Sequence, residues 1–163
     1  MTTRFAWLAA VWTVCASASG VPGQESELRQ LDWLIGEWTF EDVQLDGQYT
    51  EVGTRSCEYV LGGDYIACES RGVDHRGRER TYLWYFNYNE HEARFEITSL
   101  FQGYPAKLLY TATVHDDGHR LEIRYGSWEG DRIVVEGGAT VTYDGEDRYV
   151  WENARFRDVV TRR

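Results

Sequence analysis

Arg55 is the charged residue of this sequence whose surroundings say most about chemistry. It lies in a segment of alternating polar and apolar residues that also brings in Trp38, Phe40 and Tyr59. If these side chains share the inner face of a sheet, the guanidinium is a buried cation and needs a partner. Two interpretations follow. The guanidinium stacks on Trp38 and pairs with an internal carboxylate such as Asp42, or it anchors the acid group of a ligand.

Two cysteines, Cys57 and Cys68, are placed to form a disulfide bond. A hairpin centred on Gly62-Gly63 sets them opposite each other on neighbouring strands. Disulfides are typical of exported proteins, and the N-terminus of this chain has the pattern of an export signal. A reactive thiol would need a nearby base, and this pairing offers none. We therefore predict a cross-strand disulfide.

Four histidines raise the question of a metal or haem site. A hairpin centred on Asp117-Gly118 puts His115 and His119 on opposite faces. His75 and His91 fall at the tips of separate predicted loops. The sequence therefore predicts no metal site and no cofactor.

Side chains for acid, base or nucleophilic catalysis are few on the expected inner face. The sequence has no G-x-S-x-G pattern, and we expect no paired acids on that face and no histidine there except His119 at the rim. Inner tyrosines could orient or protonate a substrate, as in an isomerase, cyclase or decarboxylase, but buried tyrosines more often fill space. These tyrosines are Tyr59, Tyr82, Tyr110 and Tyr125. A barrel enzyme stays an alternative, and we assign no catalytic residue.

The N-terminus has the pattern of a secretory signal peptide. Residues 1–4 end in an arginine, residues 5–16 are almost wholly apolar, and Ala16-Ser17-Ala18 supplies the small residues that a signal peptidase accepts. This apolar run is too short for a bilayer, which needs about twenty residues. We interpret residues 1–18 as a cleaved signal, which predicts a secreted or periplasmic protein without a membrane span.

The remaining residues, 19–163, have the length of one domain with one core. The whole chain has 17 basic residues; without Arg4 there are 16 against 27 acidic ones, a net charge of −11. This charge argues against nucleic acid and anionic lipid as partners. No linker or internal repeat interrupts the domain, which we expect to be a monomer or a weak dimer.

The first predicted element is a short helix, and the rest of the chain has the pattern of β-strands. Leu28, Leu31 and Leu34 fall at helical spacing, and Gly36 is the stop signal expected after them. From Trp38 onward the hydrophobic period is two, with turn signals every eight to twelve residues. This pattern predicts nine to ten antiparallel strands in a meander.

The turn positions define which residues face each other, because paired residues share one face of the sheet. The predicted inner pairs are Trp38 with Arg55, Phe40 with Gly53, Cys57 with Cys68, Tyr59 with Ile66, Ile66 with Phe86, Cys68 with Trp84, Ser70 with Tyr82, Trp84 with Ile97, Phe86 with Phe95, Val114 with Leu121, Ala112 with Ile123, and Tyr110 with Tyr125. The opposite face is polar, with pairs such as Thr113 with Glu122 and Asn87 with Arg94.

A long meander with one wet face buries its other face by curling up, and closure removes its exposed edges. The predicted fold is therefore all-β, an up-and-down antiparallel β-barrel preceded by one short helix. The last hairpin, within residues 134–156, fits two registers equally well. This ambiguity leaves Thr140 and Trp151 unplaced.

A helix that ends in Gly-x-Trp and enters the first strand of a barrel resembles the calycin superfamily of lipocalins and fatty-acid-binding proteins. The stretches LDWLIGEW, LGGDYI and YFNYNEHEARFEITSL resemble, more closely, a bacterial family of secreted lipocalin-like proteins. The resemblance covers most of residues 19–163. It implies a barrel that holds a small molecule.

The resemblance also implies that Trp38 plugs one end of the barrel under a basic side chain. Arg55, Arg155 and Arg157 are the candidates for that side chain. We assign structural roles to Gly36, Trp38 and Phe40, with Phe40 lying over the glycine that faces it. Internal arginines of fatty-acid-binding barrels imply, in turn, a ligand carboxylate on Arg55.

The sequence thus predicts a barrel that binds a small apolar or aromatic molecule, with or without an acid group. The predicted ligand-binding residues are Arg55, Tyr59, Ile66, Tyr82, Trp84, Phe86, Phe95, Ile97, Tyr110, Ile123 and Tyr125. Two alternatives stay open beside it: the barrel enzyme, and a barrel packed throughout that acts on a partner protein through its rim loops.

Overall fold

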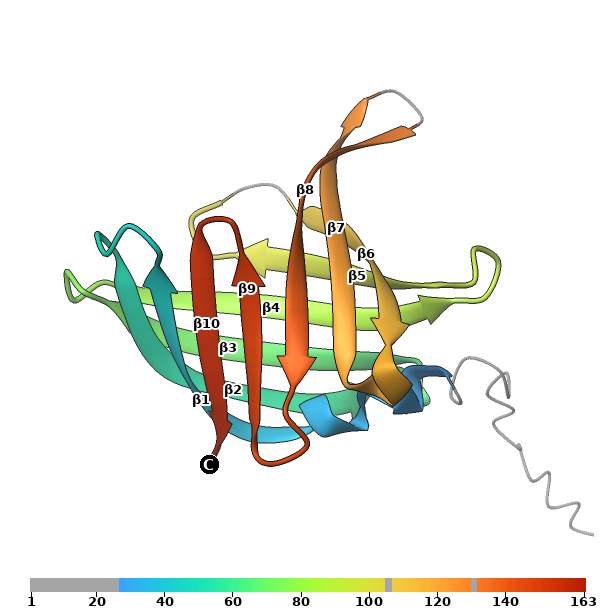
Figure 1. Ribbon diagram of the computed structural model, residues 1–163, viewed down its shortest axis with the longest axis horizontal. Helices are drawn as coiled ribbons and strands as arrows, with labels where there is room; N and C mark the ends of the chain where they lie inside the picture. Colours follow the sequence, from blue (N-terminus) through green and yellow to red (C-terminus); the bar gives the residue numbers. More distant parts are fainter. Residues whose placement is uncertain (1–26, 105–106, 130–131) are drawn as a thin grey trace, which may run out of the picture.

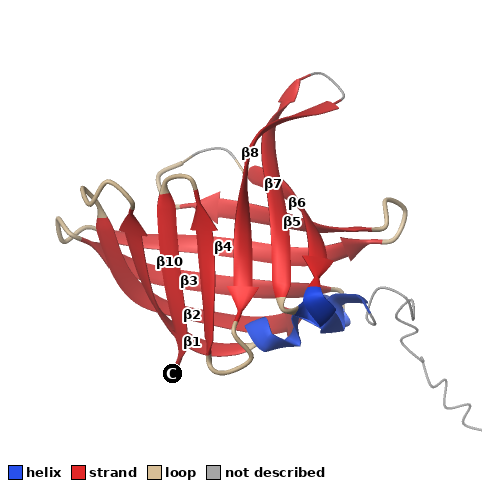
Figure 2. Ribbon diagram, viewed as in Figure 1, coloured by secondary structure: helices blue, strands red, loops and turns tan. Residues whose placement is uncertain are grey.

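The computed structural model describes residues 27–104, 107–129 and 132–163, with side chains described outside residues 127–136. Within these ranges the chain forms a closed barrel of ten antiparallel strands with three short 3-10 helices (Figures 1 and 2). Each strand pairs with the next, and β1 pairs with β10 to close the barrel. The predicted all-β meander is therefore confirmed. The predicted signal peptide, residues 1–18, lies outside the described residues.

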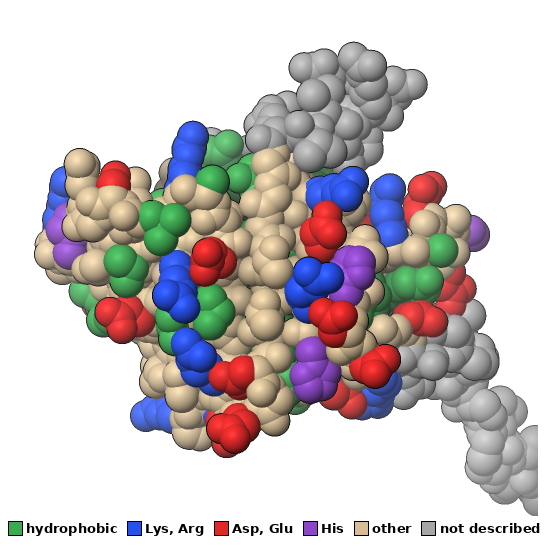
Figure 3. All heavy atoms as spheres, viewed as in Figure 1, with side chains coloured by type: hydrophobic (Ala, Val, Ile, Leu, Met, Phe, Trp, Pro, Cys, Tyr) green, Lys and Arg blue, Asp and Glu red, His purple; other side chains and the backbone are tan. Residues whose placement is uncertain are grey.

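The elements follow one another with short connections. Their bounds are η1 (Arg29–Leu34), β1 (Gly36–Gln44), β2 (Thr50–Val60), η2 (Leu61–Gly63), β3 (Tyr65–Asp74), β4 (Glu79–Asn89), β5 (Arg94–Phe101), β6 (Leu108–His115), η3 (Asp116–Gly118), β7 (Arg120–Glu129), β8 (Arg132–Tyr143), β9 (Arg148–Asn153) and β10 (Phe156–Arg162). Acidic and basic side chains are interspersed on the face seen in Figure 3, which agrees with a solvated exterior.

The helix η1 lies at one end of the barrel, beside the start of β1 (Figure 1). Its Leu31 and Leu34 are buried, and the indole Nε1 of Trp33 donates to the carbonyl of Gly118 in η3 at 2.8 Å. The chain leaves η1 through Gly36, whose φ is +130°. This backbone conformation favours glycine, and a Cβ at this position would also lie 2.6 Å from Nη1 of Arg162 and displace the end of that side chain.

Trp38 follows as a buried plug at this end, with its Nε1 donating to the carbonyl of Leu34 at 2.8 Å. The basic side chain on its ring belongs to Arg162, whose guanidinium carbon lies 4.2 Å from the ring centroid. The sequence-based candidates Arg55, Arg155 and Arg157 were therefore wrong for this role. Arg162 reaches the plug because β10 pairs with β1 and sets it directly opposite Trp38.

Most of the predicted strand pairs are confirmed. The registers of β1 with β2, β2 with β3, β3 with β4, and β6 with β7 are those expected from their turns. The facing cysteines Cys57 and Cys68 form the predicted disulfide between β2 and β3. Phe40 faces Gly53, and a Cβ on that glycine would lie 2.7 Å from the phenyl ring.

The register of β4 with β5 was wrong by two residues. Trp84 faces Ser99 and Phe86 faces Ile97, whereas the expected partners were Ile97 and Phe95. The turn occupies residues 90–93, one residue later than expected, because Ala93 takes the left-handed conformation with φ 48°. A shift by two keeps every side chain on its predicted face, so the inner surface is unchanged in kind.

The predicted exterior pair of Asn87 with Arg94 was wrong for the same reason, and Asn87 faces Glu96. The last hairpin, left open by the sequence, places Trp151 opposite Val141 and Thr140 opposite Glu152. Trp151 therefore points inward and Thr140 outward.

The buried core fills the half of the barrel next to η1. It is built by alternate residues of every strand, and its members include Leu28, Leu31, Trp38, Ile66, Phe86, Phe95, Ile97, Leu121, Ile123, Val141, Tyr149 and Val160. The other half of the interior is not filled in this way.

Candidate ligand-binding site

A cavity of about 620 Å³ occupies the half of the barrel farther from η1. Residues at strand ends remote from η1 line it, among them Gln44 at the end of β1, Phe101 at the end of β5 and Phe156 at the start of β10. The half of the barrel next to η1 is therefore packed with side chains, and the other half contains the cavity. A barrel packed throughout, which was one alternative from the sequence, does not describe this interior.

The cavity brings together five of the predicted ligand-binding residues. These are Arg55, Tyr82, Trp84, Tyr110 and Tyr125. Phe40, which was assigned a structural role, lines the cavity as well.

The other six predicted residues lie away from the cavity. Ile66, Phe86, Phe95, Ile97 and Ile123 belong to the buried core. The hydroxyl of Tyr59 donates to the carboxylate of Asp32, and Arg29 lies over its ring at 4.5 Å, which places Tyr59 beside η1. The alternation of residues along a strand predicts which side chains point inward, but it says nothing about depth along the barrel axis.

One wall of the cavity carries three carboxylates on neighbouring strands. Asp42 on β1 faces Asp158 on β10 on one side and Glu51 on β2 on the other. We call Asp158, Asp42 and Glu51 the acidic row. The expectation of no paired acids on the inner face was wrong. The register of the first hairpin already set Asp42 opposite Glu51, whereas Asp158 lay beyond the hairpin whose register the sequence left open.

Arg55 crosses this row and is bonded on three sides. Its Nη2 donates to Oδ2 of Asp158 at 2.9 Å, Nη1 to the hydroxyl of Tyr149 at 2.6 Å, and Nε to Oγ of Ser70 at 2.8 Å. The residue is only 9% exposed. Burial alone would lower the pKa of Arg55, but Tyr149 and Asp158 raise it overall, so the guanidinium stays charged.

The two sequence-based interpretations of Arg55 can now be compared with its contacts. Its carboxylate partner is Asp158, not the expected Asp42, and its guanidinium lies 5.4 Å from the ring centroid of Phe40 rather than on Trp38. Arg55 therefore joins β2, β3, β9 and β10 across the interior, and three of its donors are already in use.

Asp42 is the member of the acidic row with the most unusual ionisation. Burial, together with the nearby charges of Asp158 and Glu51, raises the pKa of Asp42 to about 7, although Arg55 acts in the opposite direction. Burial also raises the pKa of Asp158. The row therefore holds its negative charge at a cost, since three acids share one poorly hydrated wall.

Glu51 is held by two tyrosines. Its Oε2 accepts from the hydroxyl of Tyr82 at 2.7 Å and from the hydroxyl of Tyr49. The side chain lies over Gly72, where an added Cβ would come within 2.1 Å of Oε1. Burial and then the Glu51 contact raise the pKa of Tyr49 to about 12 and raise that of Tyr82 as well. Both tyrosines are therefore hydrogen-bond donors at neutral pH rather than bases.

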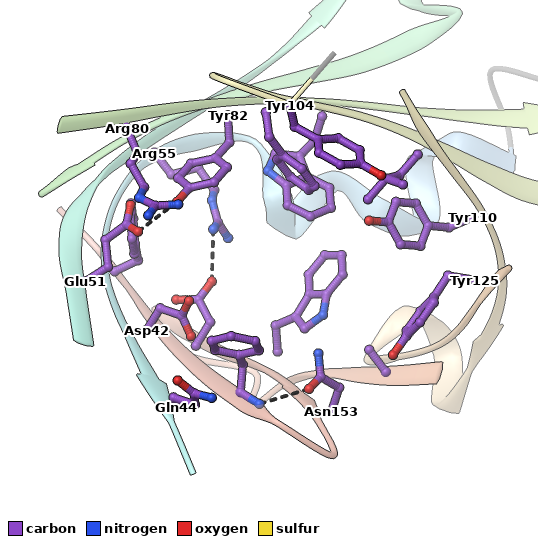
Figure 4. Close-up of a pocket in the computed structure, with 18 of the residues that line it drawn as sticks. Asp42, Gln44, Glu51, Arg55, Arg80, Tyr82, Tyr104, Tyr110, Tyr125 and Asn153 are labelled. Carbon is purple, nitrogen blue, oxygen red and sulfur yellow. Dashed lines mark hydrogen bonds and ion pairs between the residues drawn. The ribbon is translucent and has the colours of Figure 1, made fainter. Parts of the chain in front are cut away.

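Aromatic rings form much of the rest of the cavity, which we call the aromatic wall. Its members are Trp84, Phe101, Tyr110, Tyr125 and Trp151. The ring of Trp84 lies 5.0 Å from that of Trp151 and 5.7 Å from that of Phe101, and the rings of Tyr110 and Tyr125 are 5.9 Å apart. Figure 4 shows Glu51, Asp42 and Arg80 on one side of the cavity and Tyr110 and Tyr125 on the other.

The histidines lie apart from one another. His115 is 3.6 Å from Glu122, His119 packs against Tyr143, and His75 contacts Tyr49. Among the residues that the structure describes, no group of three or more His, Cys, Asp or Glu side chains is arranged to hold a metal ion. None of the described helices is long and apolar enough to span a membrane.

Comparisons with known proteins return matches among solved structures alone. No protein-family model matches the chain, and no curated protein does. A redesigned β-barrel bound to the fluorophore DFHBI is 11% identical, with a TM-score of 0.44 over 80% of this chain and 99% of that one. A de novo designed fluorescence-activating β-barrel is 12% identical, with a TM-score of 0.45 over 82% of this chain and 96% of that one.

Proposed function

We propose that this chain is a binding protein for a small aromatic or apolar molecule held inside the barrel. The observation that carries the proposal is the cavity of about 620 Å³, which falls within the usual range of about 300 to 1,000 Å³ for small-molecule sites. A molecule that enters from the open half would meet the packed core and the Trp38 plug at the far end. The site is therefore a blind pocket rather than a channel.

The composition of the pocket supports binding of a flat, largely apolar molecule. The aromatic wall offers ring faces and edges for stacking. A few polar groups, gathered on the opposite side, would orient the molecule. We propose no catalytic residue.

We further propose that the protein acts after export, in the periplasm or outside the cell, as a monomer or a weak dimer. The signal-like sequence of residues 1–18 supports export. The Cys57–Cys68 disulfide is compatible with an oxidising compartment.

A neutral reporter dye tests binding in the cavity. N-phenyl-1-naphthylamine, whose fluorescence rises in apolar surroundings, should bind the wild type with a micromolar dissociation constant. Leu108→Trp fills part of the cavity from β6, and we expect it to weaken dye binding at least tenfold. Leu100→Trp, the same change on the outer face of β5, serves as the matched control and should leave binding within twofold.

Equal affinities for the wild type and Leu108→Trp, with both proteins folded by circular dichroism, would place the dye elsewhere and refute binding inside the barrel. No dye binding at any concentration up to its solubility would refute it as well.

A further inference from the structure

We propose that the cavity recognises the ammonium group of an aromatic amine through the acidic row, rather than a carboxylate through Arg55. The inference rests on the proposed function, because it names the chemical class of the molecule that the same cavity takes.

The acidic row places its charges side by side. Asp158, Asp42 and Glu51 occupy directly opposed positions on β10, β1 and β2, where Cβ atoms of neighbours are about 4.5 to 5.5 Å apart. All three line the cavity. A cation in the cavity beside Asp42 is therefore flanked by a carboxylate on each side.

Each carboxylate of the row has a buried oxygen without a hydrogen-bond partner among the described residues. These buried atoms are Oδ1 of Asp42, Oδ1 of Asp158 and Oε1 of Glu51. All three atoms have almost no accessible surface, and Oε1 of Glu51 packs against Gly72, so a ligand reaches them only when the carboxyl groups turn toward the cavity. Buried acceptors without a donor are unfavourable. A ligand that brings donors, and no acceptor, would relieve them.

An ammonium group meets this requirement, since it has three N–H donors and no acceptor. A ligand carboxylate would instead add a fourth acid to a wall that already repels negative charge. Arg55 would offset that repulsion only in part, because it is 9% exposed and already bonded to Asp158, Tyr149 and Ser70. The other arginine of the cavity, Arg80, lies over the ring of Tyr49 and 3.6 Å from Asp74.

The remainder of the ligand is set by the aromatic wall. An aromatic ring carried one or two carbons from the ammonium group would lie against Trp84 and Trp151 while the charge meets the acidic row. The three carboxylates of the row are not arranged to hold a metal ion, and a metal ion would leave the aromatic wall unused. The arrangement of both walls in one cavity therefore favours an organic cation.

Three naphthalene compounds that differ only in their head group test the inference. They are 2-naphthylmethylamine, 2-naphthalenemethanol and 2-naphthoate, each measured at pH 8 by displacement of N-phenyl-1-naphthylamine and by calorimetry. We expect the amine to bind at least tenfold more tightly than the alcohol, and the carboxylate to bind most weakly. Asp42→Asn and Glu51→Gln should each reduce the preference for the amine at least threefold. Glu41→Gln, an outward neighbour on β1, should leave it unchanged.

The outcomes separate the two proposals. Dye binding with equal affinities for the amine and the alcohol, or with the carboxylate bound most tightly, would overturn amine recognition and leave the binding function standing. A preference for the amine that survives in both Asp42→Asn and Glu51→Gln would show that the acidic row does not make it, and would also overturn the inference. Failure of the dye and of all three compounds to bind would refute the proposed function itself.

Discussion

At the scale of single residues, each buried charge of the interior needs a partner, and the partners were the hardest feature to predict. The sequence predicted that Arg55 points inward and faces Trp38, and both are correct in register. It did not predict Asp158 as the partner, because turn signals define register only where one turn position fits better than another. The role of Arg162 was missed for a different reason: its contact with Trp38 exists only once the first and last strands pair.

Asp42 provides a prediction about pH. Its pKa is about 7 in the folded protein and about 3.8 when unfolded, so between these values the folded state binds the extra proton. Stability should therefore fall as pH rises from about 4 to about 7 and stay lower above that. Asp42→Asn removes this contribution and should raise the melting temperature at pH 8 more than at pH 5. Thermal unfolding at both pH values measures the difference, with Glu41→Gln on the same strand as control.

The pKa of Asp158 is also raised, so its contribution to stability changes with pH in the same direction. Asp158 is still present in Asp42→Asn. The test is therefore the change in pH dependence between the wild type and Asp42→Asn. The same change in Glu41→Gln, or a larger gain for Asp42→Asn at pH 5 than at pH 8, would contradict the assignment.

At the scale of secondary structure, hairpins were predictable where the turn has a distinctive residue. Gly77, with φ 75°, ends the turn between β3 and β4 as expected. The pairs between these two strands have the register that this turn predicts. The turn between β4 and β5 instead puts Ala93 in the left-handed region, where an alanine gives no signal. The resulting error of two residues kept the inner face intact but gave Trp84 and Phe86 the wrong partners.

The disulfide between β2 and β3 provides a prediction about an element. It closes a short loop of 11 residues separation, for which the chain-entropy relation gives about 2 to 3 kcal/mol of stabilisation. The double variant Cys57→Ala/Cys68→Ala should lose about that much in free energy of unfolding, measured with urea. Reductant should bring the wild type close to the double variant and leave the double variant unchanged. The bond is not formed if reductant leaves the urea unfolding of the wild type unchanged and two thiols can be alkylated before any reductant is added.

At the scale of the whole molecule, the interior divides into a packed half and an open half. Alternation of side chains predicted the closed barrel and the residues facing inward, because burial of one face of a meander leaves few other solutions. The position of the boundary was not predictable in this way. It depends on how far each inward side chain reaches across the barrel, as for Phe86 in the core and Trp84 in the cavity, two residues apart on β4.

This division predicts that the two halves respond separately to mutation. Arg162 joins β10 to η1 and β1, since it covers Trp38 and donates to the carbonyls of Ile35 and Trp33. It also pairs with Asp147. Arg162→Ala removes a cation–π contact and several hydrogen bonds, so we expect a loss of about 2 to 3 kcal/mol in unfolding free energy. Dye affinity in the cavity should stay within twofold of the wild type well below the melting temperature.

The matched control is Arg157→Ala on the same strand, where an exposed arginine pairs with Glu152 and about 0 to 1 kcal/mol is at stake. Urea unfolding and dye titration of both variants give the comparison. A loss of affinity in Arg162→Ala that parallels its loss of stability would mean that the plug and the cavity form one cooperative unit. The Trp38 plug and the lining of the cavity both use strands β1 and β10, but Arg162 contacts none of the described residues that line the cavity. We therefore expect Arg162→Ala to lower the unfolding free energy and to leave the dye affinity unchanged.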